Sequence, residues 1–139
     1  MFALDTNVLA RYYVREERAS RTTLAQAEAA RRVIESDAEL FVAKTVVLEL
    51  EWVLRGAYGF ARSEVLRALE HLLGLPNLRI EDRATVENAL ANLRDGFDFA
   101  DALHHSSSRT CEVLLTFDTR RFANRARRKA LTPPVRVPA

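Results

Sequence analysis

The sequence predicts an α/β fold with a central, mostly parallel sheet of four to five strands. Short apolar runs of strand length recur along the chain, at residues 2–5, 40–43, 78–80 and 113–117. Helical patterns fill the intervals between these runs. Strands that alternate with helices in this way join through right-handed crossovers and form a parallel sheet.

Length and composition are typical of one compact domain, which we expect to span residues 1–139. Hydrophobic residues make up 48% and charged residues 29%, as in an ordinary soluble protein. No apolar stretch could span a bilayer, and the chain begins with a strand instead of a signal segment, so we expect a cytoplasmic protein. The single cysteine, Cys111, is expected to pack as a buried apolar side chain.

The first half of the chain is predicted to contain three helices. A short one should run from Asn7 to about Arg15, after the first strand. The Ala-, Arg- and Glu-rich segment 22–36 is a strong helix pattern. After the strand at 40–43, Thr45 is a candidate cap for a helix that ends near Ala57.

The second half continues the alternation. A leucine-rich helix should start near Ser63 and stop at Gly74. Further helices are predicted at 82–94 and about 98–109, on either side of the turn at Gly96. A short helix follows Asp118, and residues 135–137 form a candidate edge strand.

Five carboxylates occupy positions that such a sheet would gather. Asp5 and Asp118 end two of the predicted strands, and the others are Glu49, Asp98 and Asp101. Sites in open α/β folds form outside the carboxyl ends of the strands. Because clustered carboxylates repel one another, a hard divalent cation is the simplest way to stabilise them together.

Several of these acids also have a simpler explanation as helix caps. Asp5 and Asp118 lie at strand-to-helix junctions, and Asp98 with Asp101 resembles a capping box. Glu49 is different, because a helical wheel places it in an apolar sector with no basic partner three or four residues on. Glu51, by contrast, has Arg55 at i+4 and is expected to form an ordinary surface pair.

A run of basic residues, 120–129, follows Asp118 directly. It contains the candidate phosphate contacts Arg120, Arg121 and Arg125, and arginine suits bidentate binding of phosphate. A solvated helix face remains the alternative for this run.

Four segments resemble, in order, the motifs of PIN-domain ribonucleases. They are Leu4-Asp5-Thr6-Asn7-Val8-Leu9, Val47-Leu48-Glu49-Leu50-Glu51-Trp52-Val53-Leu54, Asp98-Phe99-Ala100-Asp101-Ala102-Leu103 and Leu115-Thr116-Phe117-Asp118. Each motif is weak alone, but the ordered set is specific. In particular, the set resembles the VapC toxins of type II toxin–antitoxin systems.

That resemblance implies a three-layer α/β/α fold and an endoribonuclease that depends on Mg²⁺ or Mn²⁺ and hydrolyses phosphodiester bonds with metal-activated water. It also implies homodimerisation and inhibition by a VapB-type antitoxin. Carried over by position, Asp5, Glu49, Asp101 and Asp118 form a catalytic, metal-binding quartet with Asp98 as an accessory acid. Asn7 would brace the loop after the first strand and Thr116 would orient the site. One departure is the segment 104–108, His-His-Ser-Ser-Ser, where relatives tend to have small apolar residues.

Other functions remain open from the sequence. The chain could be a PIN-domain nuclease of RNA processing outside a toxin–antitoxin pair, or a catalytically silent module that binds RNA or a partner. A Mg²⁺-dependent aspartyl phosphotransferase or receiver would also gather acids at strand ends. Such phosphatases usually have a second aspartate where this chain has Asn7, and neither Lys44 nor Lys129 is placed for a receiver's lysine.

Overall fold

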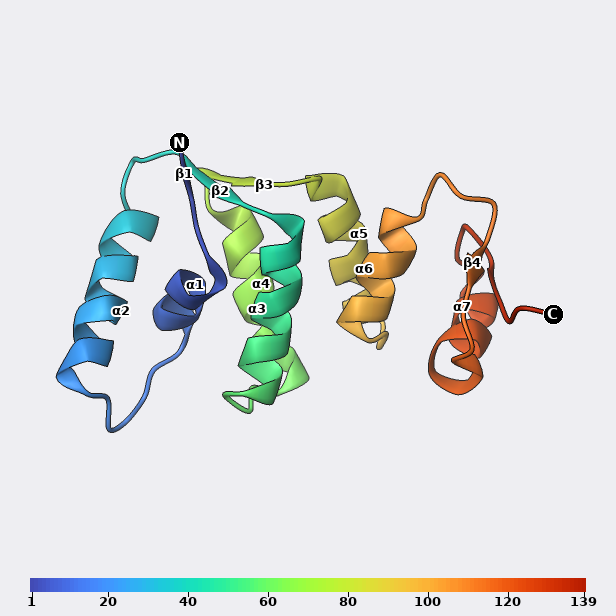
Figure 1. Ribbon diagram of the computed structural model, residues 1–139, viewed down its shortest axis with the longest axis horizontal. Coiled ribbons are helices and arrows are strands. Elements are labelled where there is room, and N and C mark those ends of the chain that lie inside the picture. Colours follow the sequence, from blue (N-terminus) through green and yellow to red (C-terminus); the bar gives the residue numbers. More distant parts are fainter. The chain divides into compact units, whose positions relative to one another are not determined.

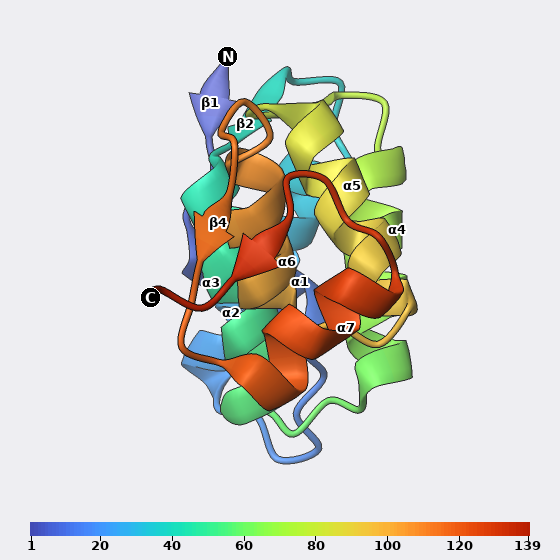
Figure 2. The same cartoon turned by 90° about the vertical axis from the view of Figure 1, so that its right-hand side faces the viewer.

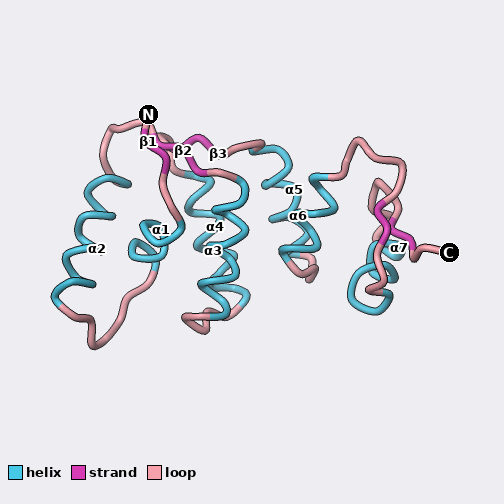
Figure 3. Tube along the Cα trace, in the orientation of Figure 1, coloured by secondary structure: helices cyan, strands magenta, loops and turns pink.

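The computed structural model describes residues 1–139 and divides into two compact units, Met1–Arg83 and Ala84–Ala139. Each unit has its own parallel sheet, of three strands in the first and two in the second. Helices make up most of both units, and the strands are short (Figures 1 and 3). The predicted α/β class with parallel strand pairing is confirmed.

The first unit contains the strands β1 (Phe2–Ala3), β2 (Leu40–Val42) and β3 (Leu78–Ile80). The order is β1-β2-β3, so β2 pairs in parallel with a neighbour on each side. Apolar side chains of β2 and β3 are buried at alternate positions, while Arg79 between them is exposed. This alternation fixes which face of β3 contributes to the core.

Four helices accompany this sheet, and their bounds are α1 (Thr6–Tyr13), α2 (Arg21–Ile34), α3 (Lys44–Gly56) and α4 (Arg62–Gly74). Helix α1 packs against α2 and α3, and α3 packs against α4. Figure 1 shows the three strands at one end of these helices. Ser20 caps α2 through a hydrogen bond from the Thr23 amide.

The start of α3 differs from the prediction that Thr45 caps it. The helix begins one residue earlier, at Lys44, and its N-cap Ala43 has no side chain that can accept a hydrogen bond. Instead the Lys44 amide donates to Glu81 Oε1, 2.8 Å away, just beyond β3. A side chain distant in sequence therefore satisfies the helix terminus, which a local sequence pattern does not reveal.

The second unit is built from α5 (Arg83–Arg94), α6 (Phe99–Ser107), β4 (Leu114–Leu115), the π-helix η1 (Thr119–Ala123), α7 (Asn124–Arg128) and β5 (Val135–Arg136). Figure 2 shows β4 and β5 side by side, and their register pairs Leu114 with Val135. Phe97, Phe99, Leu103 and Phe122 are buried in its interior.

Two strands are shorter than predicted because their last residues leave the ladder to form the turns before helices. The first ends at Ala3, although the Leu4 amide still donates to the Phe41 carbonyl at 2.9 Å. The strand at 114–115 likewise gains one more bond, from the Thr116 amide to the Arg136 carbonyl, also 2.9 Å. The predicted edge strand at 135–137 is present as β5.

The predicted burial of Cys111 is wrong, because this residue is exposed. Its amide donates to the Ser108 carbonyl at 2.9 Å, so it belongs to the turn after α6. No helix of the chain has both the length and the apolar character needed to cross a membrane.

Candidate active site

The first unit carries Asp5 and Glu49. Asp5 follows β1 and is the N-cap of α1, with its Oδ1 2.7 Å from the Thr6 amide nitrogen that donates to it. The capping bond uses one carboxylate oxygen and fixes the direction of the other. Glu49 lies on α3, the helix against which α1 packs, and both acids are exposed. Exposure keeps both carboxylates accessible to a ligand.

The roles that the sequence suggested for the two glutamates of α3 are reversed in the structure. Glu49 is exposed, whereas Glu51 is buried at 4% exposure beside Val47 and Leu50. Buried positions 47, 50, 51 and 54 form an i, i+3, i+4, i+7 face, so the predicted apolar sector around Glu49 was wrong. The predicted pair is present, since Arg55 Nε donates to Glu51 Oε1 at 2.8 Å, but it is not an ordinary surface pair.

The second unit carries Asp98, Asp101 and Asp118. Asp98 is the N-cap of α6, and its Oδ2 accepts a hydrogen bond from the Asp101 amide at 3.1 Å. Asp101 lies in the first turn of that helix and is partly buried. The cap thus fixes Asp98 relative to the backbone that carries Asp101.

Asp118 is held in a similar way on the other side of β4. Its Oδ1 accepts from the Arg121 amide at 3.0 Å, which caps the π-helix η1. Its own amide donates to Thr116 Oγ1 at 3.1 Å. Thr116 therefore orients the backbone at Asp118. The predicted role of Thr116 in orienting the site requires a contact of this kind.

The three acids of this unit influence one another electrostatically. Burial raises the pKa of Asp101 above its usual value, and the charges of Asp98 and then Asp118 raise this pKa further. His104 lowers the pKa of Asp101, as the last and smallest influence. Asp98 and the more distant Asp118 are thus close enough to Asp101 to disfavour its ionised form.

A packed group of rings supports these acids from inside the unit. The Phe122 ring on η1 meets the rings of Phe97 and His105 edge-on, with centroids 6.4 and 6.2 Å away. His105 is one turn beyond Asp101 on α6, and its Nε2 is 2.7 Å from the Pro133 carbonyl oxygen. The side chains behind all three acids therefore pack together.

Segment 104–108, the departure from the family pattern, also has structural roles. Buried Ser106 donates to the Thr85 carbonyl at 2.8 Å and accepts from Asn88 Nδ2 at 3.2 Å. Ser108 donates to the His104 carbonyl at 2.8 Å, near the end of α6. Ser106 therefore joins α6 to α5, and Ser108 stabilises the end of α6.

The side chains of the remaining predicted residues take no part in the helix caps that hold the acids. Arg120 and Arg121 are exposed on η1, whereas Arg125 Nη1 donates to the Gly96 carbonyl at 2.6 Å and so anchors the turn before Asp98. Asn7 is exposed and lines a groove of about 530 Å³ between α1 and α2. The structure gives Asn7 no hydrogen bond that would brace the loop after β1.

The PIN domain family matches residues 2–128 of the chain. The protein belongs to the PIN-domain family. The match covers both units and all five acids, and PIN domains are generally nucleases that use divalent metal ions. Comparison with curated proteins gave no significant match.

The donor set of this PIN domain suits a hard divalent cation, because all five candidate ligands are carboxylates. The raised pKa of Asp101 points the same way, since a nearby cation would offset the repulsion from Asp98 and Asp118. No group of three or more His, Cys, Asp or Glu side chains is arranged as a complete metal site.

One exposed side chain beside the acids was not predicted to have a role. Phe117, immediately before Asp118, is 80% exposed. The sequence signal was available, as an aromatic residue between a strand and a candidate catalytic acid, but the apolar run 113–117 suggested a buried strand instead.

Proposed function

We propose that this PIN domain is a VapC-like toxin that cleaves RNA in the cytoplasm as an endoribonuclease dependent on Mg²⁺ or Mn²⁺. The proposal rests on the PIN-domain match over residues 2–128 together with three carboxylates of the second unit, Asp98, Asp101 and Asp118, that lie close enough to influence one another. Helix capping accounts for the positions of Asp98 and Asp118. It does not account for Asp101, which lies close enough to both carboxylates to be affected by their charges. Perturbed acids of this kind are typical of functional sites.

The metal ligands in this proposal are Asp5, Glu49, Asp98, Asp101 and Asp118. When bound, a divalent cation would lower the pKa of a coordinated water and offset charge on the phosphate. Asp5, Asp98 and Asp118 each commit one oxygen to a helix cap, which pre-orients the other oxygen. Either Glu49 or Asp101 accepts the proton of the attacking water, and the raised pKa of Asp101 makes it a stronger base than an ordinary aspartate.

Arginines supply the contact with the RNA backbone. Arg120 and Arg121 are exposed and form no ion pair within the protein, so their guanidinium groups are free to bind phosphate. Arg125 instead holds Gly96, so its contribution is to the position of the turn before Asp98. Affinity for RNA should therefore fall with salt, mainly through the first two arginines.

A VapB-type antitoxin would need a surface of its own, and the first unit has one. A groove of about 780 Å³ lies along α1, α2 and α4 and includes Tyr12, Tyr13, Leu24 and His71. Leu24 is 59% exposed there, and Tyr13 is hydrogen-bonded to His71 Nδ1 at 2.9 Å. Aromatic and apolar side chains mixed with charged ones, such as Arg31 and Glu64, suit an amphipathic partner segment. We propose further that the protein forms a homodimer.

Cleavage of purified total RNA tests the proposal. We expect cleavage with Mg²⁺, none with a chelator, and at least about a hundredfold loss in Asp5→Asn and Asp118→Asn. Asp95→Asn is the matched control, because Asp95 is an exposed aspartate of the second unit outside the acid set. Cleavage that survives both chelation and Asp5→Asn would refute the metal-dependent mechanism.

Measurements of RNA binding, RNA cleavage and cell growth distinguish the alternative functions. RNA binding without cleavage under any of these conditions would favour a silent binding module. Cleavage without growth arrest when the protein is expressed alone would favour an RNA-processing nuclease outside a toxin–antitoxin pair. Growth arrest that requires Asp118 supports the toxin.

A further inference from the structure

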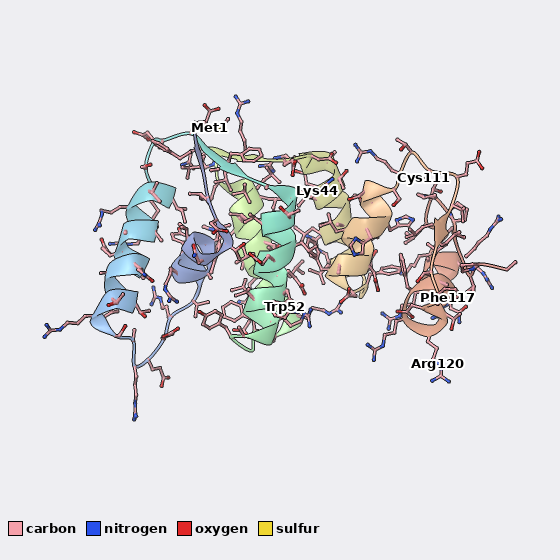
Figure 4. The ribbon with its side chains drawn as sticks, in the orientation of Figure 1. Met1, Lys44, Trp52, Cys111, Phe117 and Arg120 are labelled. Carbon is pink, nitrogen blue, oxygen red and sulfur yellow. The ribbon has the colours of Figure 1, made fainter.

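The side chain of Phe117 is exposed on a backbone that is held in place. The neighbouring Thr116 amide donates to the Arg136 carbonyl at 2.9 Å, and the following Asp118 amide donates to Thr116 Oγ1 at 3.1 Å. Phe117 lies between these two fixed points with 80% of its surface exposed. Figure 4 labels Phe117 together with Arg120 in the C-terminal part of the chain.

Folding does not account for an aromatic residue at this position. The neighbouring β4 residue Leu115 is also 56% exposed, so the two form an apolar surface that the second unit does not cover. The core beneath is already filled, since Phe122 packs between Phe97 and His105. An exposed apolar surface beside a candidate active site is typical of a binding surface.

Three arginines adjoin this surface in sequence or in strand register. Arg120 and Arg121 follow Phe117 within four residues, and Arg136 is the register partner of Leu115 on β5. All three arginines are exposed, and none forms an ion pair or a side-chain hydrogen bond in the protein. An aromatic ring flanked by free guanidinium groups is complementary to a base with its adjoining phosphates.

We propose that Phe117 is a stacking platform for one unpaired base of the RNA, beside the phosphate that is cleaved at Asp118. Arg120, Arg121 and Arg136 bind the phosphates on either side of that base. The inference rests on the proposed ribonuclease function and adds to it a contact with one unpaired base, because a paired base cannot present its face to the ring.

Binding measured without cleavage tests this inference separately from catalysis. Fluorescence anisotropy of a labelled single-stranded oligoribonucleotide, with chelator present, should show about tenfold weaker binding for Phe117→Ala. Phe117→Trp should retain affinity, whereas Phe117→Leu should resemble the alanine variant because it is apolar without a flat ring. Phe2→Ala is the control for loss of an exposed aromatic side chain elsewhere, and should bind normally.

Two further measurements identify the contact. Phe117→Trp in a Trp52→Phe background should give tryptophan fluorescence that is quenched on binding RNA, and a scan of single abasic positions should find one at which the quenching is lost. Phe117→Ala should leave the salt dependence of affinity unchanged, while Arg136→Ala should reduce its slope.

The outcomes that overturn the inference are distinct from failure of the nuclease. Unchanged affinity in Phe117→Ala, or equal affinity in the leucine and tryptophan variants, would exclude stacking. A change in oligomeric state of Phe117→Ala with normal RNA affinity would assign this surface to a protein interface. Absence of cleavage with intact, Phe117-dependent binding would refute the proposed activity and leave the stacking contact standing.

Discussion

Asp101 shows at the level of one residue how the acids of the second unit act on one another. Its pKa is raised by burial first and by Asp98 and Asp118 next. The folded protein therefore holds this proton more tightly than the unfolded chain. The stability that Asp101 contributes is present below its unfolded-state pKa and is lost as the pH rises through the folded-state pKa. At neutral pH the ionised carboxylate destabilises the metal-free protein.

We predict that Asp101→Asn raises the thermal unfolding midpoint of the metal-free protein at pH 7. Below about pH 3 the variant and the natural chain should unfold at similar temperatures, because Asp101 is then protonated in both states. Mg²⁺ should stabilise the natural chain more than the variant. Calorimetry at both pH values checks this, with Asp95→Asn as control. An equal gain for the control would assign the effect to net charge alone.

The ion pair between buried Glu51 and exposed Arg55 leads to a second prediction. Glu51 is 4% exposed, whereas the Arg55 side chain is 50% exposed. Arg55→Ala should lower the free energy of unfolding by about 1–3 kcal/mol, because it removes a hydrogen bond to a buried carboxylate. Adding Glu51→Leu should recover most of that loss, since the leucine fits the apolar face of α3. Urea denaturation measures both.

Glu49 lies on the same helix as Glu51 but is exposed, so its substitution should affect activity and not stability. Glu49→Gln should leave the free energy of unfolding within about 0.5 kcal/mol, because the residue is exposed, yet it should abolish RNA cleavage. Glu51→Leu should do the opposite and retain cleavage. If Glu51→Leu abolished cleavage in a folded protein while Glu49→Gln retained it, the carboxylate of the site would be Glu51.

At the scale of elements, the sequence was sufficient where a pattern is local. The strand at 78–80 and the helices around it follow from apolar runs bounded by glycine and proline, and the structure has them with nearly the predicted bounds. Helix α3 shows what a local pattern misses. Its buried face includes a glutamate, so hydrophobicity alone chose the wrong face, and its N-terminus is satisfied by Glu81 from after β3.

The acids illustrate the same limit within the site. Order and spacing identified Asp98, Asp101 and Asp118, and the structure brings these three within electrostatic reach. The π-helix that Asp118 caps was expected only as a short helix, because π-helical turns have no simple sequence signal. Exposure of Phe117 was not foreseen either, since an apolar run does not show where a strand leaves its ladder.

The contact between His105 on α6 and Phe122 on η1 allows a test of how much this packing stabilises the protein. His105 is 2% exposed, packs against Phe122 and bonds to the Pro133 carbonyl, whereas adjacent His104 is exposed. We expect His105→Ala to lower the free energy of unfolding by about 2–4 kcal/mol, since it leaves a cavity and an unpaired carbonyl. His104→Ala should change this free energy by less than about 0.5 kcal/mol. Similar losses in both variants would mean that the Phe122 contact contributes little.

At the scale of the whole molecule, the PIN domain match runs through residues 2–128 although the chain has two compact units. The second unit is poorly equipped to fold alone. It has a sheet of only two short strands, and short chains bury a small fraction of their surface. These features favour a single cooperative domain over residues 1–139.

Two natural probes allow this last prediction to be tested. Trp52 is the only tryptophan and belongs to the first unit, while exposed Cys111 is the only cysteine and belongs to the second. In guanidinium denaturation, Trp52 fluorescence and a fluorophore on Cys111 should report the same midpoint and the same dependence on denaturant, because two-state unfolding is independent of the probe. Unlabelled protein followed by Trp52 controls for the label. A Cys111 transition at lower denaturant than that of Trp52 would show that residues 84–139 unfold separately, and the acids of the two units would then belong to independently stable parts.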